Sequence, residues 1–237
     1  MTASSSGFVF LSQSSDSSGT SEKKQLREAH LAKRSRLSAP KIDLLSSSIQ
    51  KRFWRLRSVR NLDKRLLGKQ AVWMSCYVDF DREVQTRNLL RKALGRGYKV
   101  AVPVVLPGSN ASIMLSEVST VPGQGDPGPG WVRSSFGLMQ PRDLRPVDPF
   151  EIDCFVVPGL AFDRFGFRLG FGKGHYDRLL EAAKSEIPRI GLAFSWQLVE
   201  RLPREHWDVQ MHRVVTEEKV IRCNLGLSSN HVHCSKR

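Results

Sequence analysis

The sequence predicts an α/β fold: one domain built on an open, mainly parallel sheet with helices on both faces. Short apolar runs rich in β-branched residues alternate along the chain with stretches whose apolar residues repeat at helical spacing. Such alternation is typical of parallel sheets covered by helices. The chain has 237 residues, of which 40% are hydrophobic, and this is enough for one domain with a sizeable core.

The two ends of the chain are predicted to lie outside this domain. Residues 1–20 contain eight Ser, one acidic residue and no Lys or Arg, a composition that predicts a disordered extension. Their only apolar patch is too short for a secretory signal and lacks its basic flank, and no apolar run approaches the ~20 residues of a membrane helix. We therefore expect a cytoplasmic protein with a domain at residues 21–225 and a flexible tail at residues 226–237.

The four cysteines form no CxxC pair. Cys76 and Cys154 lie in strand-like apolar runs, where we expect them to be buried as small hydrophobic residues. In the tail, His231, His233 and Cys234 form only a weak metal-binding pattern.

Two helices are predicted before the first strand, one starting at Ser21 and ending before Pro40 and one over residues 43–57. The first carries Lys23 and Arg27, which are four residues apart and therefore lie on one side of the helix. Basic residues on a helix most often form a solvated face. A polyanionic partner is the alternative, since the 85 residues that follow residue 20 hold 21 Lys and Arg against 7 Asp and Glu, a surplus as large as the formal charge of +14 on the whole chain.

The remaining elements are predicted in the order of an open parallel sheet. The first strand covers residues 71–78 and is too apolar to have a wet face. A helix follows from Thr86, its N-cap, to about Leu94, and residues 121–130 are expected to be irregular. Further strands are predicted at residues 99–105, 113–115, 152–157, 189–194, 212–216 and 219–221.

A glycine-rich stretch joins the strand at residues 152–157 to a helix that begins near Tyr176. Its glycines are Gly166, Gly170, Gly172 and Gly174. Alternate glycines let backbone N–H groups converge on an anion, and the N-terminus of the next helix directs its dipole to the same point. Arg168 and Lys173 add positive charge, and Asp177 stands where a carboxylate can hold Mg²⁺ on phosphate oxygens. The alternative is a plain structural turn; the spacing matches neither GxxxxGK[ST] nor GxGxxG.

Two motifs in this region closely resemble the signature of the 5-formyltetrahydrofolate cyclo-ligase family, whose members are also called 5,10-methenyltetrahydrofolate synthetases. They are residues 158–163 (PGLAFD) and residues 168–178 (RLGFGKGHYDR). The sequence departs from the family at His175, where an aromatic residue such as Tyr is more frequent. The resemblance extends from about Lys23 to Ile221 and implies a three-layer α/β/α, Rossmann-like fold.

The resemblance also implies which residues bind the ligands. For ATP it implies Lys23, Arg27, Arg168, Leu169, Gly170, Phe171, Gly172, Lys173, Gly174, His175 and Tyr176. For the folate it implies Val78, Glu83, Phe171, Gly172, Lys173, Gly174 and His175, with Tyr77 beside them. For Mg²⁺ it implies Asp177 and Asp208, and it places Gln140 and Pro141 near the substrate pocket. From residue type alone, Glu83 would be a solvated loop carboxylate, and Asp208 near His206 would be a structural contact.

The reaction that the resemblance implies is the ATP-dependent conversion of 5-formyltetrahydrofolate to 5,10-methenyltetrahydrofolate, with release of ADP and phosphate. The formyl oxygen attacks the γ-phosphoryl group, and N10 then closes the ring, with Lys173 and Arg168 as the catalytic cations. The substrate can carry a polyglutamate tail, and no nucleic acid or membrane is required as a partner. The alternatives are a non-catalytic relative that binds nucleotide, folate or RNA, and a small-molecule kinase with the same phosphate site.

Overall fold

The structure, a computed structural model, describes residues 17–68, 70–106, 113–135 and 137–223 of the chain. The serine-rich extension up to residue 16 and the tail that carries the His and Cys pattern lie outside the described residues. Within the described part, no helix combines the length and the apolar character needed to cross a membrane.

Helix α1 (Ser17–Ser35) begins four residues before the predicted start of the first helix. Small polar residues make up its first turn, and such residues are well tolerated at a helix start.

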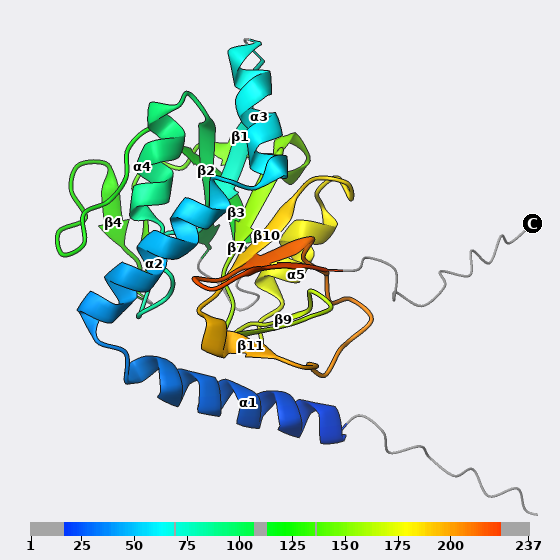
Figure 1. Cartoon of the computed structure of the whole chain (residues 1–237). Coiled ribbons are helices and arrows are strands. Elements are labelled where there is room, and N and C mark those ends of the chain that lie inside the picture. Colours follow the sequence, from blue (N-terminus) through cyan, green and yellow to red (C-terminus); the bar gives the residue numbers. More distant parts are fainter. Residues whose placement is uncertain (1–16, 69, 107–112, 136, 224–237) are drawn as a thin grey trace, which may run out of the picture.

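The fold is a mixed α/β domain around one large sheet (Figure 1). Its strands lie in the order β13 (Val220–Arg222), β12 (Arg213–Val215), β10 (Arg189–Leu192), β7 (Cys154–Val157), β1 (Trp73–Cys76), β2 (Lys99–Val105), β3 (Ile113–Val118) and β6 (Pro146–Val147). The strands from β12 to β2 run parallel, and β13, β3 and β6 add antiparallel pairs at the edges. In the central strand β1, Met74 pairs with Val100 of β2 and with Cys154 of β7. The prediction of a mainly parallel sheet is confirmed.

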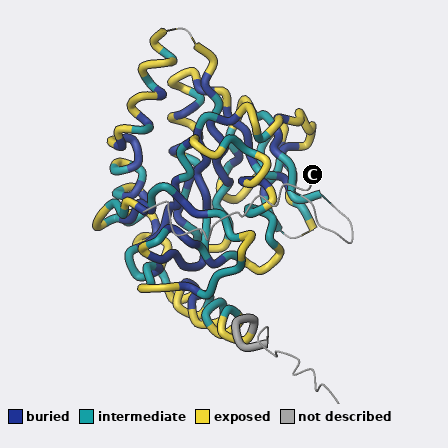
Figure 2. The backbone as a smooth tube through the Cα atoms, turned by 90° about the vertical axis from the view of Figure 1, so that its right-hand side faces the viewer, coloured by how far each residue is buried: buried dark blue, intermediate teal, exposed yellow. Residues whose placement is uncertain are grey.

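Both faces of the sheet are buried, because neighbouring residues of each central strand enter different apolar clusters. In β7, Cys154 and Val156 pack with helices α2 (Ala39–Phe53), α3 (Arg57–Leu67) and α4 (Arg87–Gly95). Phe155 and Val157 face the other way and pack with helix α5 (His175–Glu181). Figure 2 shows the buried segments gathered at the centre of the domain. The prediction that Cys76 and Cys154 are buried is confirmed.

The prediction of a single second helix over residues 43–57 was wrong, since the structure has α2 and α3 there. Leu56 takes an extended conformation at the start of α3 and separates the two helices. Trp54 and Leu56 are both buried in the core, so tertiary packing makes the break and no Gly or Pro marks it in the sequence. Thr86 precedes α4 as predicted, but its side chain does not cap the helix; its hydroxyl donates to the carbonyl of Tyr77.

The glycine-rich stretch is more structured than predicted. It contains the hairpin of β8 (Ala161–Asp163) and β9 (Arg168–Leu169), which is joined by β11 (Leu198–Val199) into a small second sheet. Strands β4 (Trp131–Arg133) and β5 (Met139–Pro141) form a separate pair, and η1 (Pro149–Glu151) and η2 (Ser195–Gln197) are short 3-10 turns. The hairpin turn requires Gly166, whose φ is 91° and whose backbone lies against the carbonyl of Met211. These strands are two or three residues long, too short to show a period in the sequence.

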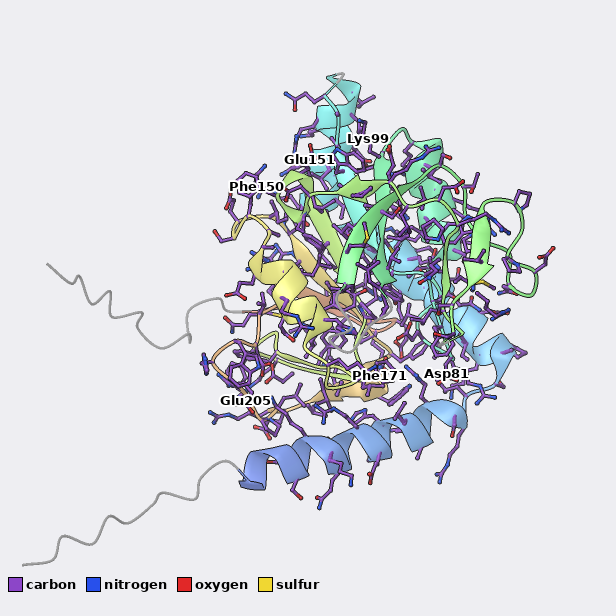
Figure 3. The ribbon with its side chains drawn as sticks, turned by 180° about the vertical axis from the view of Figure 1, so that it is seen from behind. Asp81, Lys99, Phe150, Glu151, Phe171 and Glu205 are labelled. Atoms are coloured by element: carbon purple, nitrogen blue, oxygen red, sulfur yellow. The ribbon has the colours of Figure 1, made fainter. Side chains whose placement is uncertain are left out.

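Helix α1 lies apart from the other helices, along the end of the domain where β9 and β11 are found (Figure 1). This is the end to which β1 and β7 point, because both strands are parallel and finish at Cys76 and Val157. Figure 3 shows Glu205, Phe171 and Asp81 in a row beside α1. The carboxyl ends of parallel strands are the usual place for a ligand site in such sheets.

Candidate functional site

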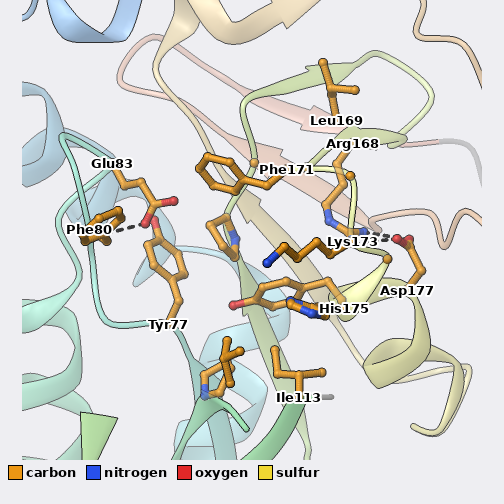
Figure 4. Close-up of a pocket in the computed structure, with 18 of the residues that line it drawn as sticks. Tyr77, Phe80, Glu83, Ile113, Arg168, Leu169, Phe171, Lys173, His175 and Asp177 are labelled. Carbon is orange, nitrogen blue, oxygen red and sulfur yellow. Dashed lines mark hydrogen bonds and ion pairs between the residues drawn. The ribbon is translucent and has the colours of Figure 1, made fainter. Parts of the chain in front are cut away.

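A pocket of about 420 Å³ opens at this end of the sheet (Figure 4). It is lined by every residue that the sequence analysis assigned to ATP, folate or Mg²⁺: Lys23, Arg27, Val78, Glu83, Arg168, Leu169, Gly170, Phe171, Gly172, Lys173, Gly174, His175, Tyr176, Asp177 and Asp208. They come from α1, the segment after β1, the stretch from β9 to α5, and the segment before β12. Tyr77 lines the pocket as expected, while its wall from β5 is formed by Met139 and not by Gln140 or Pro141.

The loop before α5 has the open backbone that the glycines predicted. Gly172 and Gly174 have φ of 92° and 63°, in the left-handed region that disfavours a side chain. Helix α1 packs directly on this loop, since Arg27 Nε donates to the carbonyl of Gly170 at 2.9 Å. A Cβ on Gly172 would lie 3.1 Å from the guanidinium carbon of Arg27. The absence of a side chain at this position therefore lets a cation approach the loop closely.

Ion pairs hold two cations of the pocket, Arg168 and Lys23, against its carboxylates. Arg168 donates two hydrogen bonds of 3.1 Å to Asp177, whose Oδ1 also accepts the backbone N–H of Val209. Lys23 Nζ lies 3.2 Å from Asp208 Oδ2, which also accepts the backbone N–H of Glu205 at 2.8 Å. Each carboxylate is thus fixed in orientation by a cation and a backbone N–H, and each lies at the pocket wall.

Asp177 and Asp208 are the carboxylates predicted for Mg²⁺. Among the described residues, no group of three or more His, Cys, Asp or Glu side chains is arranged to hold a metal ion. Two carboxylates suit a Mg²⁺ that takes its other ligands from phosphates and water. Residue types and positions therefore fit a nucleotide-bound Mg²⁺ better than a metal centre made by the protein alone.

Glu83 lies on the opposite wall of the pocket from the glycine loop, as Figure 4 shows. Its carboxylate accepts the backbone N–H of Phe80 at 3.2 Å, and Arg34 Nη1 stands 3.7 Å from its other oxygen. Burial raises the pKa of Glu83 to about 7, against the opposing effects of Arg34 and of the Phe80 N–H. Residue type alone suggested that Glu83 is a solvated loop carboxylate. The structure instead shows a buried hydrogen-bond acceptor, and its raised pKa places its change of charge near neutral pH.

Comparison with known proteins identifies the family to which this pocket belongs. The sequence profile of the 5-formyltetrahydrofolate cyclo-ligase family matches residues 19–217. The chain belongs to this family. A 5-formyltetrahydrofolate cyclo-ligase of Haemophilus influenzae is 34% identical over 151 residues, which cover 62% of this chain and 76% of the relative. The enzyme of the same name from Escherichia coli strain K12 is 33% identical over 150 residues, covering 62% of this chain and 79% of the relative.

Solved structures agree with this assignment. The NMR structure of the 5,10-methenyltetrahydrofolate synthetase of Aquifex aeolicus matches with a TM-score of 0.69 and 32% identity, over 90% of this chain and 99% of that chain. A 5,10-methenyltetrahydrofolate synthetase from Mycoplasma pneumoniae matches with a TM-score of 0.59 and 25% identity, over 83% and 99%. The cyclo-ligase family membership predicted from the two motifs is confirmed.

Several residues of the cyclo-ligase pocket were not predicted from sequence. Its apolar wall includes Phe80, Pro103, Val105, Ile113, Leu138, Met139, Pro158, Gly159 and Trp207, and Glu205 adds a carboxylate. Phe80, Pro158 and Gly159 follow the ends of β1 and β7, and that position was the available signal for these three. Arg34 was also missed, because one Arg among the many cations of α1 carries no distinguishing pattern.

Proposed function

We propose that this protein is an ATP-dependent 5-formyltetrahydrofolate cyclo-ligase. It would convert 5-formyltetrahydrofolate to 5,10-methenyltetrahydrofolate and release ADP and phosphate. The observation that carries the proposal is the single pocket in which the cations of α1, the glycine loop and the buried carboxylate of Glu83 meet. The family match and the names of the relatives support the same reaction.

In this proposal the triphosphate of ATP lies between α1 and the glycine loop. Lys23 and Arg27 reach it from one face of α1, and residues 168–176 supply backbone N–H groups together with Arg168 and Lys173. Positive side chains and glycine backbone on two sides of one space suit a polyphosphate. The contact between Arg27 and Gly170 supports the idea that the helix and the loop act on the same ligand.

The folate is assigned to the wall that carries Glu83. An ionised carboxylate facing the N–H groups of a pterin ring makes paired, charge-strengthened hydrogen bonds. Val78 and the ring of Phe171, 56% exposed, provide apolar surface on either side, and His175 stands beside the loop backbone. Apolar walls with one convergent polar group are typical of small-molecule sites.

Asp177 and Asp208 are assigned to Mg²⁺. Bound with ATP, this ion would neutralise charge on the phosphate oxygens. The two carboxylates would anchor it to α5 and to the segment before β12.

The chemical step needs a good leaving group on the formyl carbon. The formyl oxygen attacks the γ-phosphorus and ADP departs. N10 then attacks the formyl carbon and loses its proton to the phosphate or to water, and the C–O bond breaks as phosphate leaves. Lys173 and Arg168 are assigned to neutralise the charge on the transferred group, and the pocket walls hold the two substrates in line. Little acid–base catalysis by side chains is required.

The test is to mix the protein with ATP, Mg²⁺ and 5-formyltetrahydrofolate and to follow the near-ultraviolet absorbance of the methenyl product. The variant Lys173→Ala should lose about 100-fold or more of this activity at an unchanged melting temperature. Lys64→Ala, at an exposed position of α3, is the matched control and should retain full activity.

Other results would identify the alternatives. ADP production only after another small-molecule acceptor is added would indicate a kinase that acts on another substrate. Tight binding without either product would indicate a non-catalytic relative. Full activity of Lys173→Ala would remove Lys173 from the catalytic role.

The finer expectations belong to the same proposal. A three-layer, Rossmann-like arrangement is supported by the two apolar clusters on opposite faces of the sheet. A cytoplasmic location fits the reaction, in which no membrane or nucleic acid takes part. A polyglutamate tail on the folate fits the basic first half of the chain, and comparison of the affinities for mono- and pentaglutamate substrates would test it.

A further inference from the structure

Arg34 of α1 is a buried cation to which the proposed mechanism gives no role. Its side chain is 2% exposed, and its guanidinium lies 5.6 Å from the ring centroid of Phe171 in the glycine loop. Nη2 donates to Asp81 Oδ2 at 2.9 Å, while Nη1 stands 3.7 Å from Glu83 Oε1. Burying a guanidinium is unfavourable unless its partners compensate. A charge buried at the edge of a pocket therefore suggests a function beyond holding the helix.

Arg34 belongs to a junction between the end of α1 and the turn that carries Glu83. Asp81 and Arg82 have φ of 42° and 60°, left-handed values that are unfavourable for residues other than glycine. Arg34 holds the first of them through its hydrogen bond to Asp81. Arg82 in turn donates to the carbonyl of Ser35 at 2.6 Å. Contacts in both directions thus keep the turn in this conformation, and Glu83 follows it directly.

Arg34 also acts on the charge of Glu83. Its guanidinium pairs with this carboxylate, and together with the N–H of Phe80 it favours the ionised form. Burial and the carboxylates of Asp79 and Asp81 favour the protonated form, and the pKa of Glu83 is raised to about 7.

Other charged and titratable groups of the described residues also lie around Glu83, and Lys173 of the glycine loop lines the same pocket. The charge of Asp79 is itself paired with Arg87. The hydroxyl groups of Tyr77 and Tyr176 lie near Glu83 and are kept neutral, because burial and Glu83 itself raise their pKa values.

We propose that Arg34 is a positioning residue for folate recognition, which fixes the turn at residues 79–83 and holds a positive charge beside Glu83, so that this carboxylate can accept N–H groups of the pterin. The inference rests on the proposed function for its ligand. It adds a residue outside the pocket lining that sets both the place and the charge of the recognising carboxylate. The contact with Phe171 connects the same guanidinium to the glycine loop.

The first test is the affinity for 5-formyltetrahydrofolate, measured by calorimetry from pH 6 to pH 9. Arg34→Met should weaken folate binding at pH 7 by about tenfold and move the midpoint of the pH profile upward by about one unit or more, because an opposite charge at this distance typically shifts a carboxyl pKa by that much. The affinity for ATP should change less than the affinity for folate. Arg36→Met, at an exposed position two residues further on, is the matched control and should behave as wild type.

Two further variants keep the test valid if Arg34→Met folds poorly. Arg34→Lys retains the charge, so the midpoint of the pH profile should stay close to that of the wild type. Affinity should fall, because an ammonium group cannot direct one N–H to Asp81 and another toward Glu83 as the guanidinium does. Asp81→Asn keeps Arg34 but weakens the hold on the turn, and it should lower folate affinity at every pH. In a Glu83→Gln background, Arg34→Met should have less than about half of its usual effect on folate affinity, since contacting residues that act through one another are not additive.

Carbon-detected NMR of the ligand-free protein separates this inference from the proposed function. The Glu83 carboxyl should titrate near pH 7 in the wild type and at higher pH in Arg34→Met, whether or not folate is a substrate. If wild type neither binds nor cyclises the folate, the proposed function fails. If Arg34→Met changes folate affinity no more than Arg36→Met does, or changes it equally in the Glu83→Gln background, the role of Arg34 is refuted while the function can stand.

Discussion

The ionised carboxylate of Glu83 has an electrostatic cost in the folded chain, because it is buried. Its side chain is 11% exposed, and its pKa is raised from 4.5 to about 7, mainly by burial. Between these pH values the folded state holds a proton that the unfolded state releases. Ionisation of Glu83 therefore favours unfolding as the pH rises through this window, the reverse of the usual behaviour of an ion-paired carboxylate.

We expect this cost to be measurable by comparing the wild type with Glu83→Gln. The free energy of unfolding of the wild type, relative to the variant, should fall by roughly 3 kcal/mol between pH 4 and pH 8. Urea denaturation at a series of pH values would measure the difference. A difference that stays constant, or that rises with pH, would show that Arg34 compensates the burial of Glu83 completely.

Gly172 gives a second prediction for a single residue. Its φ of 92° is unfavourable for alanine, and a Cβ there would lie 3.1 Å from the guanidinium of Arg27. Gly172→Ala should lower the free energy of unfolding by about 1 to 2 kcal/mol and raise the KM for ATP several-fold. Gly97 has a similar φ of 88° with no atom within 4 Å of its Cβ position. Gly97→Ala should thus lose similar stability with an unchanged KM, and equal KM values for both variants would contradict the docking of Arg27 on the loop.

The site residues could be predicted where a sequence motif identified them. They could not be predicted where their role arises only from tertiary packing. The residues that the resemblance assigned to ATP, folate and Mg²⁺ all line one pocket, whereas Gln140 and Pro141 do not. Arg34 could not be selected from sequence, because its importance arises from burial against Asp81 and Glu83, 47 and 49 positions along the chain. The raised pKa of Glu83 likewise depends on the surroundings that the fold creates.

Among the elements, strand β10 depends on a residue without a side chain. Gly191 lies at the centre of this strand, where an added Cβ would stand 2.5 Å from the ring of the fully buried Phe162. Phe162 belongs to β8, so the packing of its ring on Gly191 holds the small second sheet against the large one.

Gly191→Ala should therefore reduce the free energy of unfolding by about 1 to 3 kcal/mol, since an overpacked core must shift to make room. Gly95, in helix α4, has nothing within 4 Å of its Cβ position. Gly95→Ala should leave stability unchanged or raise it by up to about 1 kcal/mol. Chemical denaturation would compare the two, and equal stability of both variants would argue against close packing of β8 on β10.

The elements themselves were predicted well where the sequence holds a continuous apolar run, as in β1, β2 and β7. The division between α2 and α3 was missed because buried Trp54 and Leu56 make the break through packing. The hairpin of β8 and β9 was missed because strands of two or three residues carry no period. In both cases tertiary contacts decide the local structure.

On the scale of the whole molecule, charge is distributed very unevenly along the sequence. The first half holds the entire surplus of positive charge, yet the described fold brings part of it, through Lys23 and Arg27 of α1, to a loop formed by the second half. The electrostatic field of these cations attracts a polyanion, and added salt shortens the distance over which this attraction acts.

ATP affinity should consequently fall as salt is added. We expect a loss of about tenfold between about 0.02 M and 0.5 M NaCl, measured by calorimetry with constant Mg²⁺. Lys23→Gln together with Arg27→Gln should flatten this dependence, whereas Lys41→Gln and Lys64→Gln, at exposed positions of α2 and α3, should not. A dependence that is equal in both double variants would show that the field comes from the surface as a whole.

The pairing of Lys23 with Asp208 and of Arg168 with Asp177 has a consequence for how the pocket fills. In the structure these four groups pair with one another, and Lys23 also lies 3.4 Å from Glu205. A bare polyphosphate would have to pull both cations away and leave two anions beside it. A polyphosphate that arrives with its own divalent cation allows an exchange of partners instead, in which every charge keeps an opposite neighbour throughout.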